Sequence, residues 1–370
     1  MTFPNYKKNI INISATFAKF LGKETNIPTL KKLEKELAKG YEKVVFIIFD
    51  GLGINPIKLN MDKNCLLYKN IKQKLTSVFP STTTNATTTL MSCKYPMEHG
   101  WFGWSLYFEE VGKAIDIYMA KQSGTGEPVD KNYVPNKLPF TAYYLDTQSE
   151  YTINTVFQDY VVNGRSENNY IYQTEKEMAE HIINICKKEG KQFVYSYCGQ
   201  PDYTMHDFGT SSKEAKEKTA EIVSLFENMV NSCKNTLFVV TADHGQVDIH
   251  DYVPLYEDKE ILNLLRTVPY MEPRATAFNV KPDCKEKFEK LFKEKYGKDF
   301  KLYKSQTLID NGVFGLKDCN GHKELLGDYI SISKKEDKMF LLTPISPKHK
   351  GHHTCTGKEM WVPLIMVASK

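Results

Sequence analysis

The stretch VVFIIFDG, residues 44–51, indicates the fold most directly. Six apolar residues in a row, followed at once by Asp50 and Gly51, are typical of a buried strand in a parallel sheet. Three further apolar runs have the same character: FVYSY (193–197), LFVVTA (237–242) and VPLIMVA (362–368). Helical patterns lie between the runs. We therefore expect an α/β fold, with a mostly parallel central sheet that carries helices on both faces.

The clearest helical pattern covers residues 211–234. Its start, SSKE, predicts a capping box in which Ser211 pairs with Glu214. The apolar residues that then recur at helical spacing are Ile222, Leu225, Phe226 and Met229.

The length of the chain favours one large domain with an insertion. At 370 residues it exceeds the usual size of a single domain but suits a large α/β domain. We assign residues 1–257 and 341–370 to a catalytic core. Residues 258–340 contain RATAFNV, a charged helix and GDYISIS, which together predict a small α+β insertion that can act as a cap.

The charge pattern argues against a dedicated nucleic-acid-binding protein. The chain has 49 Lys and Arg residues against 45 Asp and Glu residues, a net charge of +4. Only three of the basic residues are arginines, and they are scattered at Arg165, Arg266 and Arg274. A nucleic-acid-binding surface normally concentrates arginine in a basic stripe. We therefore expect no such surface.

Three further features favour a soluble, cytoplasmic protein. No apolar run reaches the roughly 18 residues that a membrane span needs. Residues 1–40 lack a signal-peptide pattern, because lysines interrupt their apolar residues. The eight cysteines form no C-x-x-C pair, which favours reduced thiols over a disulfide framework.

Acidic residues follow three of the four predicted strands. Asp50 follows the first run, Asp202 follows FVYSYCGQP, and Asp243 follows LFVVTA. In open α/β sheets the ligand crevice lies outside the carboxyl ends of the strands. The three carboxylates should therefore converge at one edge of the sheet.

Histidines accompany these acids. His206 lies one helical turn after Asp202, His244 adjoins Asp243, and the pair His352 and His353 precedes the last strand. Alone, each Asp could be a helix cap and each His a hydrogen-bonded structural residue. Together they form an Asp and His ligand set without thiolates, which suits Zn²⁺ or Mn²⁺ and is large enough for two ions. Buried unpaired carboxylates would otherwise cost several kcal/mol each.

A Thr-rich stretch, VFPSTTTNATTTLMSC (78–93), offers a nucleophile. Two metal ions can clamp a phosphoryl group during its transfer. A threonine alkoxide held against a metal would attack phosphorus, and a helix start would offer backbone N–H groups to the phosphoryl oxygens.

These motifs resemble a known family. FPSTTTNATTTLMSCKYPMEHG, PDYTMHDFG, TADHG and the final GHH are similar, in order and spacing, to the type I phosphodiesterase/nucleotide pyrophosphatase branch of the alkaline phosphatase superfamily. The resemblance implies an alkaline-phosphatase-like fold, a two-zinc site and a threonine nucleophile. It covers the strands and ligand motifs of nearly the whole chain, but not the loops or the insertion.

The resemblance assigns roles to individual residues. The family's F-P-[ST]-x-T motif places the nucleophile at Thr83, with Thr82 as the alternative. The ligands of one metal would be Asp202, His206 and either His352 or His353. The ligands of the other would be Asp50, Asp243, His244 and the oxygen of Thr83.

The chain departs from the family pattern at two positions. Nucleotide pyrophosphatases usually have Phe directly after the nucleophile, where this chain has Thr84. They also have a phosphate-binding Asn where this chain has Trp104. Both departures bear on nucleotide selectivity, and Trp104 becomes a candidate for stacking on the substrate or for packing in an aromatic core.

The function that we expect is metal-dependent hydrolysis of a phosphodiester or phosphoanhydride bond through a covalent threonine intermediate. The partner would be a small phosphorylated substrate such as a nucleotide. A phosphomonoesterase, phosphonate hydrolase or phosphotransferase of the same superfamily is the alternative, although no Arg adjoins the motifs to bind a monoester. A non-catalytic metal-binding module is the third hypothesis.

Overall fold

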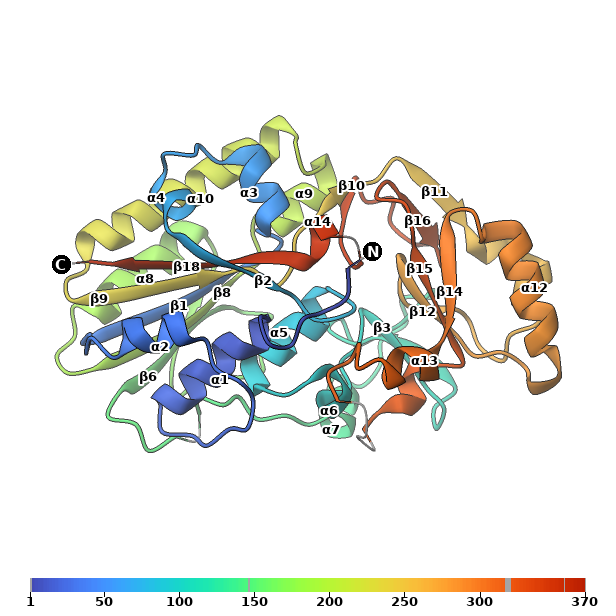
Figure 1. The fold of residues 1–370 in the computed structure, drawn as a ribbon, viewed down its shortest axis with the longest axis horizontal. Helices are drawn as coiled ribbons and strands as arrows, with labels where there is room; N and C mark the ends of the chain where they lie inside the picture. Colours follow the sequence, from blue (N-terminus) through green and yellow to red (C-terminus); the bar gives the residue numbers. More distant parts are fainter. Residues whose placement is uncertain (1, 146, 317–320, 356, 370) are drawn as a thin grey trace.

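The computed structural model describes residues 2–145, 147–316, 321–355 and 357–369. A seven-stranded sheet lies at its centre (Figure 1). The neighbouring strands β9, β1, β8, β6 and β7 are parallel, which confirms the predicted mostly parallel α/β fold. Across the sheet the strands are β2 (Ile71–Thr76), β18 (Trp361–Ala368), β9 (Thr236–Thr241), β1 (Lys43–Phe49), β8 (Gln192–Cys198), β6 (Thr152–Gln158) and β7 (Asn168–Tyr172).

The direction of the last strand corrects one expectation. All four apolar runs form strands of the central sheet, but β18 is antiparallel to both of its neighbours, β9 and β2. The direction of β18 follows from the edge of the sheet at which the strand begins. The segment before it contains His352 and His353 and pairs, at β17 (Gly351–His352), with β10 (Val247–Asp248), which follows the carboxyl end of β9. A strand that starts from this edge must run back across the sheet.

Helices cover both faces of the central sheet, as expected (Figure 1). On one face lie α1 (Ile10–Phe20), α2 (Lys31–Leu37) and α5 (Thr83–Ser92), and α1 packs against α5. On the other lie α3 (Ile54–Asn60), α4 (Leu66–Lys69), α8 (Glu175–Cys186), α9 (Asp202–Phe208) and α10 (Lys213–Ser232), with α10 packed against the other four.

Helix α10 begins one residue later than the SSKE pattern predicts. Its N-cap is Ser212, whose Oγ accepts a hydrogen bond from the backbone N–H of Ala215 at 3.0 Å. The hydroxyl of Ser211 instead donates to Asp248 at 3.4 Å. Ser211, which the local sequence predicts as the N-cap, therefore makes a tertiary contact instead.

A second, antiparallel sheet lies beside the first (Figure 1). Helix α12 (Lys285–Tyr296) packs against its outer strand β14. The predicted boundaries at residues 258 and 340 stay a prediction, and this sheet also draws three strands from residues 105–122. In order across the sheet, the strands are β14 (Phe300–Lys304), β15 (Tyr329–Ser333), β13 (Ala275–Phe278), β12 (Tyr270–Glu272), β3 (Ser105–Phe108), β4 (Lys113–Asp116) and β5 (Lys121–Gln122).

Shorter elements complete the fold. Strand β11 (Asp251–Pro254) pairs in parallel with β16 (Lys338–Leu341). The remaining α-helices are α6 (Pro96–His99), α7 (Tyr133–Lys137), α11 (Lys259–Leu262), α13 (Ser305–Asp310) and α14 (Gly357–Met360). Within the described residues, the 3₁₀ helices are Leu255–Glu257, Pro282–Cys284 and Lys323–Leu326.

Each sheet has its own hydrophobic core. In the central core every residue of β1 is buried, and Phe46 contacts Phe17 of α1 and Tyr195 of β8. Each such side chain contributes about 1.5–3 kcal/mol on burial. In the second core, Phe102 and Phe314 pack edge to face. Within the described part of the chain, no helix has the length and apolar character needed to cross a membrane.

Candidate active site

The three predicted carboxylates meet at the carboxyl edge of the central sheet. Asp50 and Asp243 follow the adjacent parallel strands β1 and β9, and Asp202 opens α9 just after β8. All three are at most 3% exposed. Gly51 permits the close approach, because a Cβ there would lie 2.9 Å from Asp202 Oδ1 and its φ of +70° disfavours other residues.

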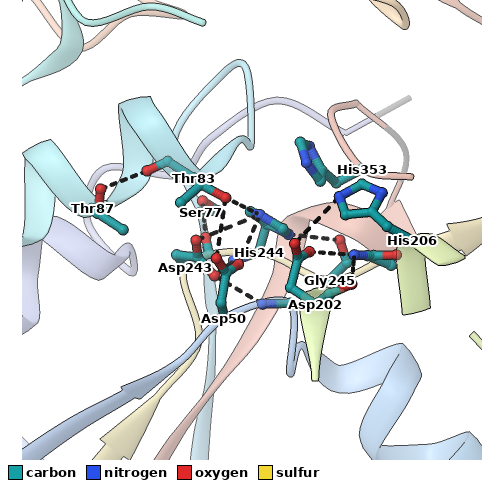
Figure 2. Close-up of polar contacts among 12 residues, drawn as sticks. Asp50, Ser77, Thr83, Thr87, Asp202, His206, Asp243, His244, Gly245 and His353 are labelled. Carbon is teal, nitrogen blue, oxygen red and sulfur yellow. Dashed lines mark hydrogen bonds and ion pairs between the residues drawn. The ribbon is translucent and has the colours of Figure 1, made fainter. Parts of the chain in front are cut away.

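Thr83 contacts one half of this cluster. As the first residue of α5, it places its Oγ1 3.3 Å from Asp50 Oδ2 and 3.2 Å from His244 Nε2. His244 Nε2 in turn lies 3.3 Å from Asp50 Oδ1 and 3.5 Å from Asp243 Oδ2. Figure 2 shows Thr83, Asp50, Asp243 and His244 facing one another.

Asp202, His206 and His353 form the other half (Figure 2). His206 lies one turn after Asp202 on α9, and its Nε2 is 3.3 Å from Asp202 Oδ2. Its Nδ1 is 2.7 Å from the backbone oxygen of Gly351, which orients the ring. The side-chain amide of Gln246 donates to the Asp202 carboxylate.

The two histidines before β18 have different surroundings. His353 offers a nitrogen that lies within 4.8 Å of ligand atoms of both Asp202 and His206, and its buried Nδ1 has no hydrogen-bond partner. His352 Nδ1 accepts the backbone N–H of His353 at 2.8 Å. The geometry therefore favours His353 over His352 as the candidate ligand.

Burial and mutual repulsion govern the charge of the cluster. Burial and the Asp202 and Asp243 carboxylates raise the pKa of Asp50 well above its ordinary value. Burial and Asp202 also raise the pKa of Asp243. Burial likewise opposes the charged form of Asp202, but His206 outweighs it and lowers the pKa of Asp202. These carboxylates hold their negative charge readily only if cations lie among them.

The donor atoms fit such cations. Three buried donor atoms of the cluster have no hydrogen-bond partner among the described residues: Asp50 Oδ1, Asp243 Oδ2 and His353 Nδ1. Buried polar atoms without a partner are uncommon, and coordination of a metal ion would account for them. Asp202, His206 and His353 offer converging ligand atoms, and so do Asp50, Asp202 and His244. Asp243 belongs to neither group; its Oδ1 accepts the backbone N–H groups of Gly51 and His244. Carboxylate and imidazole donors of this kind suit Zn²⁺ or Mn²⁺.

Thr83 differs in solvent exposure from the other hydroxyl residues of the Thr-rich stretch. Ser81, Thr82 and Thr84 to Thr89 are buried, whereas Thr83 is partly exposed. The alternative nucleophile, Thr82, is the N-cap of α5, is 1% exposed and makes no hydrogen bond through its Oγ1. The backbone N–H groups of the first turn have no acceptor within the helix, so they can receive oxygens of a bound anion.

Trp104 is exposed enough to contact a substrate but lies outside the Asp and His cluster. It is 39% exposed, and its ring centroid is 6.4 Å from that of Tyr118. Its backbone N–H donates to Glu272 at 2.7 Å. The neighbouring Trp101 is 1% exposed and packs in the second hydrophobic core.

Sequence reasoning missed several residues around the site. Tyr197, at the end of β8, donates its hydroxyl hydrogen to Asp50 Oδ2. The ring of His349 is tilted against that of His206, with ring centroids 4.3 Å apart. Tyr160 and Tyr203 share a hydrogen bond of 2.7 Å, and the pKa of both hydroxyls is raised, mainly by burial and further by Asp50. The HKGHH spacing could have pointed to His349, whereas the tyrosines carry no local signal.

The arginines are engaged elsewhere. Arg274 is buried and pairs with Glu359 at 2.8 Å, and Arg266 pairs with Asp328 at 3.6 Å. Arg165 donates to the backbone oxygens of Val161 and Asp159. Each arginine therefore has a structural partner away from the Asp and His cluster.

Solved structures with this architecture share little sequence with the chain. Murine ectonucleotide pyrophosphatase/phosphodiesterase 5, an inactive threonine-to-alanine variant in complex with AMP, superposes with a TM-score of 0.64 at 14% identity, covering 88% of both chains. The human protein of that name gives 0.61 at 14% identity, again covering 88% of both chains. Phosphonoacetate hydrolase from Sinorhizobium meliloti 1021, in complex with phosphonoformate, gives 0.60 at 13% identity, covering 88% of this chain and 90% of the other. These likenesses show the fold.

The sequence itself identifies the family. No curated protein sequence matches the chain significantly. The family described as Type I phosphodiesterase / nucleotide pyrophosphatase matches residues 44–336, which include β1, the Thr-rich stretch, α9 and the turn after β9. This match confirms the resemblance carried by the motifs. The chain therefore belongs to the Type I phosphodiesterase / nucleotide pyrophosphatase family of enzymes.

Proposed function

We propose that the protein hydrolyses phosphodiester or phosphoanhydride bonds of a small, nucleotide-like substrate, with Thr83 as the nucleophile. One observation carries the proposal. The partly exposed Thr83 hydroxyl, at the start of a helix, lies within 3.3 Å of Asp50 and His244 in a buried Asp and His cluster with unpartnered donor atoms.

The proposed metal ligands divide between two ions. Asp50, Asp243, His244 and Thr83 Oγ1 would hold one ion, and Asp202, His206 and His353 the other, with His352 as the alternative to His353. When bound, two zinc ions would lower the pKa of oxygen nucleophiles and neutralise charge that develops on the phosphoryl group. The hydrogen bond from Tyr197 to Asp50 and that from Gln246 to Asp202 would orient the carboxylates.

The chain's own residues supply the nucleophile and the anion site. Thr83 Oγ1 forms a bond to phosphorus while the bond to the leaving-group oxygen breaks, and that oxygen takes up a proton. The first-turn N–H groups of α5 donate to the phosphoryl oxygens. In the second step water forms a bond to phosphorus, the bond to Thr83 Oγ1 breaks, and the threonine hydroxyl regains its proton.

Three observations bear on the substrate. Tyr118, Tyr160, Tyr203 and Trp104 are each about two-fifths or more exposed near the site, and such rings can stack on a planar group. The AMP complex of the murine protein supports a nucleotide-like substrate by analogy. The engagement of the arginines elsewhere favours diesters over monoesters, which often require an Arg fork. Monoesterase, phosphonate hydrolase and phosphotransferase activities remain alternatives at the same site.

Turnover of bis-p-nitrophenyl phosphate tests the proposal. We expect hydrolysis that chelation abolishes and that added Zn²⁺ or Mn²⁺ restores. Thr83→Ala should lower kcat at least a thousandfold, on the scale that loss of a nucleophile produces. Thr89→Ala is the matched control, because Thr89 lies in the same helix and its hydroxyl contacts His99 instead of the Asp and His cluster. Activity that withstands both chelation and Thr83→Ala would contradict the proposal, and metal binding without turnover of any phosphate ester would support the non-catalytic alternative.

A further inference from the structure

Tyr118, just after strand β4 of the second sheet, contacts the helix that begins with the proposed nucleophile. The preceding residue, Ile117, is held in place because its N–H donates to the backbone oxygen of Trp104 at 2.9 Å. The ring of Tyr118 packs edge to face on the buried Trp101, with ring centroids 5.7 Å apart. Its hydroxyl oxygen lies 2.6 Å from Thr87 Oγ1 of α5. Contacts of both the ring and the hydroxyl therefore fix Tyr118 between the second sheet and α5.

The hydrogen bonds of Thr87 show which hydroxyl donates to which. The Thr87 hydroxyl donates to the backbone oxygen of Thr83 at 2.7 Å. A hydroxyl has one hydrogen to donate, so Thr87 Oγ1 accepts its other hydrogen bond from Tyr118. Burial raises the pKa of Tyr118 to about 12, so its hydroxyl keeps the hydrogen at neutral pH. Two hydrogen bonds in series therefore connect Tyr118, through Thr87, to the carbonyl group of the proposed nucleophile.

The peptide unit between Thr83 and Thr84 extends this connection to the proposed anion site. Thr84 is the second residue of α5, and within the described part of the chain its N–H has no hydrogen-bond acceptor. It is one of the first-turn N–H groups that would donate to the phosphoryl oxygens. The peptide unit is planar, so a hydrogen bond that holds the Thr83 oxygen also orients the Thr84 N–H. The same hydrogen bond polarises the unit and strengthens that N–H as a donor.

We propose that Tyr118 is a positioning residue, which acts through Thr87 to hold the Thr83–Thr84 peptide unit in the orientation that the transferring phosphoryl group requires. The inference rests on the proposed phosphoryl-transfer function and deepens it. Donors that are oriented before the reaction stabilise the charge of the transition state without a cost of reorganisation. Loss of the Tyr118 hydroxyl should therefore lower kcat and leave KM nearly unchanged.

The test removes each hydroxyl in turn and measures kcat and KM for bis-p-nitrophenyl phosphate at equal metal content. Tyr118→Phe keeps the ring and should lower kcat roughly fivefold, the scale of one neutral hydrogen bond. Thr87→Val should lower kcat at least as much, because it removes both hydrogen bonds, whereas Thr87→Ser keeps a hydroxyl and should recover most of that loss. Tyr133→Phe is the control, since it makes the same change in α7, where the Tyr133 hydroxyl donates to Glu110 at 2.9 Å.

A double variant separates action through Thr87 from a direct contact between Tyr118 and the substrate. If Tyr118 acts through Thr87, adding Tyr118→Phe to Thr87→Val should lower kcat no further. The inference would be overturned by an unchanged kcat in Tyr118→Phe, by losses that multiply in the double variant, by no recovery in Thr87→Ser, or by an equal loss in Tyr133→Phe. A wild-type protein without metal-dependent turnover would instead overturn the proposed function, and this inference with it.

Discussion

At the scale of single residues, position distinguishes Thr83 from the other hydroxyls of its stretch. Thr84, Thr88 and Thr89 have the same side chain but are buried along α5. Thr83 stands at the helix start, where its Oγ1 meets Asp50 and His244. A sequence motif could therefore point to Thr83. The start of the helix, its free N–H groups and the ends of the adjacent strands are all determined by local sequence.

Glu272 should also give the protein a distinct pH dependence of stability. Its pKa is raised from 4.5 to about 7 in the folded protein, so folding favours the protonated form. Its contribution is therefore fully present below pH 4.5 and is lost as the pH rises through 7, a difference of about 3 kcal/mol for a shift of this size. Glu272→Gln lacks this dependence. We expect its free energy of unfolding, relative to wild type, to increase between pH 5 and pH 8 in urea titrations at equal metal content.

One outcome of the stability comparison would contradict this prediction. The difference between Glu272→Gln and wild type would stay constant between pH 5 and pH 8 if Glu272 titrated alike in the folded and unfolded chains.

At the scale of elements, the site depends on turns that pack directly on one another. Gly53 caps α3 after β1, and Gly245 lies in the turn after β9 beside His244. The Gly245 N–H donates to the backbone oxygen of Glu359 at 2.7 Å, which ties this turn to the segment before β18. The ligand-bearing ends of β1 and β9 are therefore fixed by backbone contacts as well as by the sheet.

Gly53→Ala should disturb this packing. A Cβ at Gly53 would lie 2.5 Å from Gly245 Cα and 2.8 Å from the backbone oxygen of Trp361, atoms that cannot move aside easily. Overpacking of this kind typically costs about 1–3 kcal/mol. We expect a loss of stability in that range in urea titrations, together with weaker metal binding. Gly357→Ala is the control, since its nearest contact is the flexible end of Thr2 at 3.1 Å; equal losses in both variants would contradict this account.

At the scale of the whole molecule, the sequence predicts the two sheets unequally. The central strands, their acidic ends and the candidate ligands could be predicted, because apolar runs and strand-end residues are local signals. The antiparallel direction of β18 could not, because it depends on where the chain returns to the sheet. Nor could the pairing of β3 with β12, which joins residues far apart in the chain.

Glu272 illustrates what local patterns leave out. It lies in a short hairpin with no motif, and its contact with the Trp104 N–H arises only because β12 pairs with the distant strand β3. The buried Arg274–Glu359 pair links the same hairpin to the segment that contains His353. The second sheet is thus tied to the segment that carries a candidate ligand.

The most direct test of the central claim is to identify the residue that carries the phosphoryl group. The protein, loaded with Zn²⁺, is mixed with bis-p-nitrophenyl phosphate, quenched with acid during the first turnovers and digested for mass spectrometry. The account predicts a p-nitrophenylphosphoryl group on Thr83 that is missing from Thr83→Ala. A group on Thr82 or another residue, or turnover in which no protein-bound phosphoryl group forms, would contradict it.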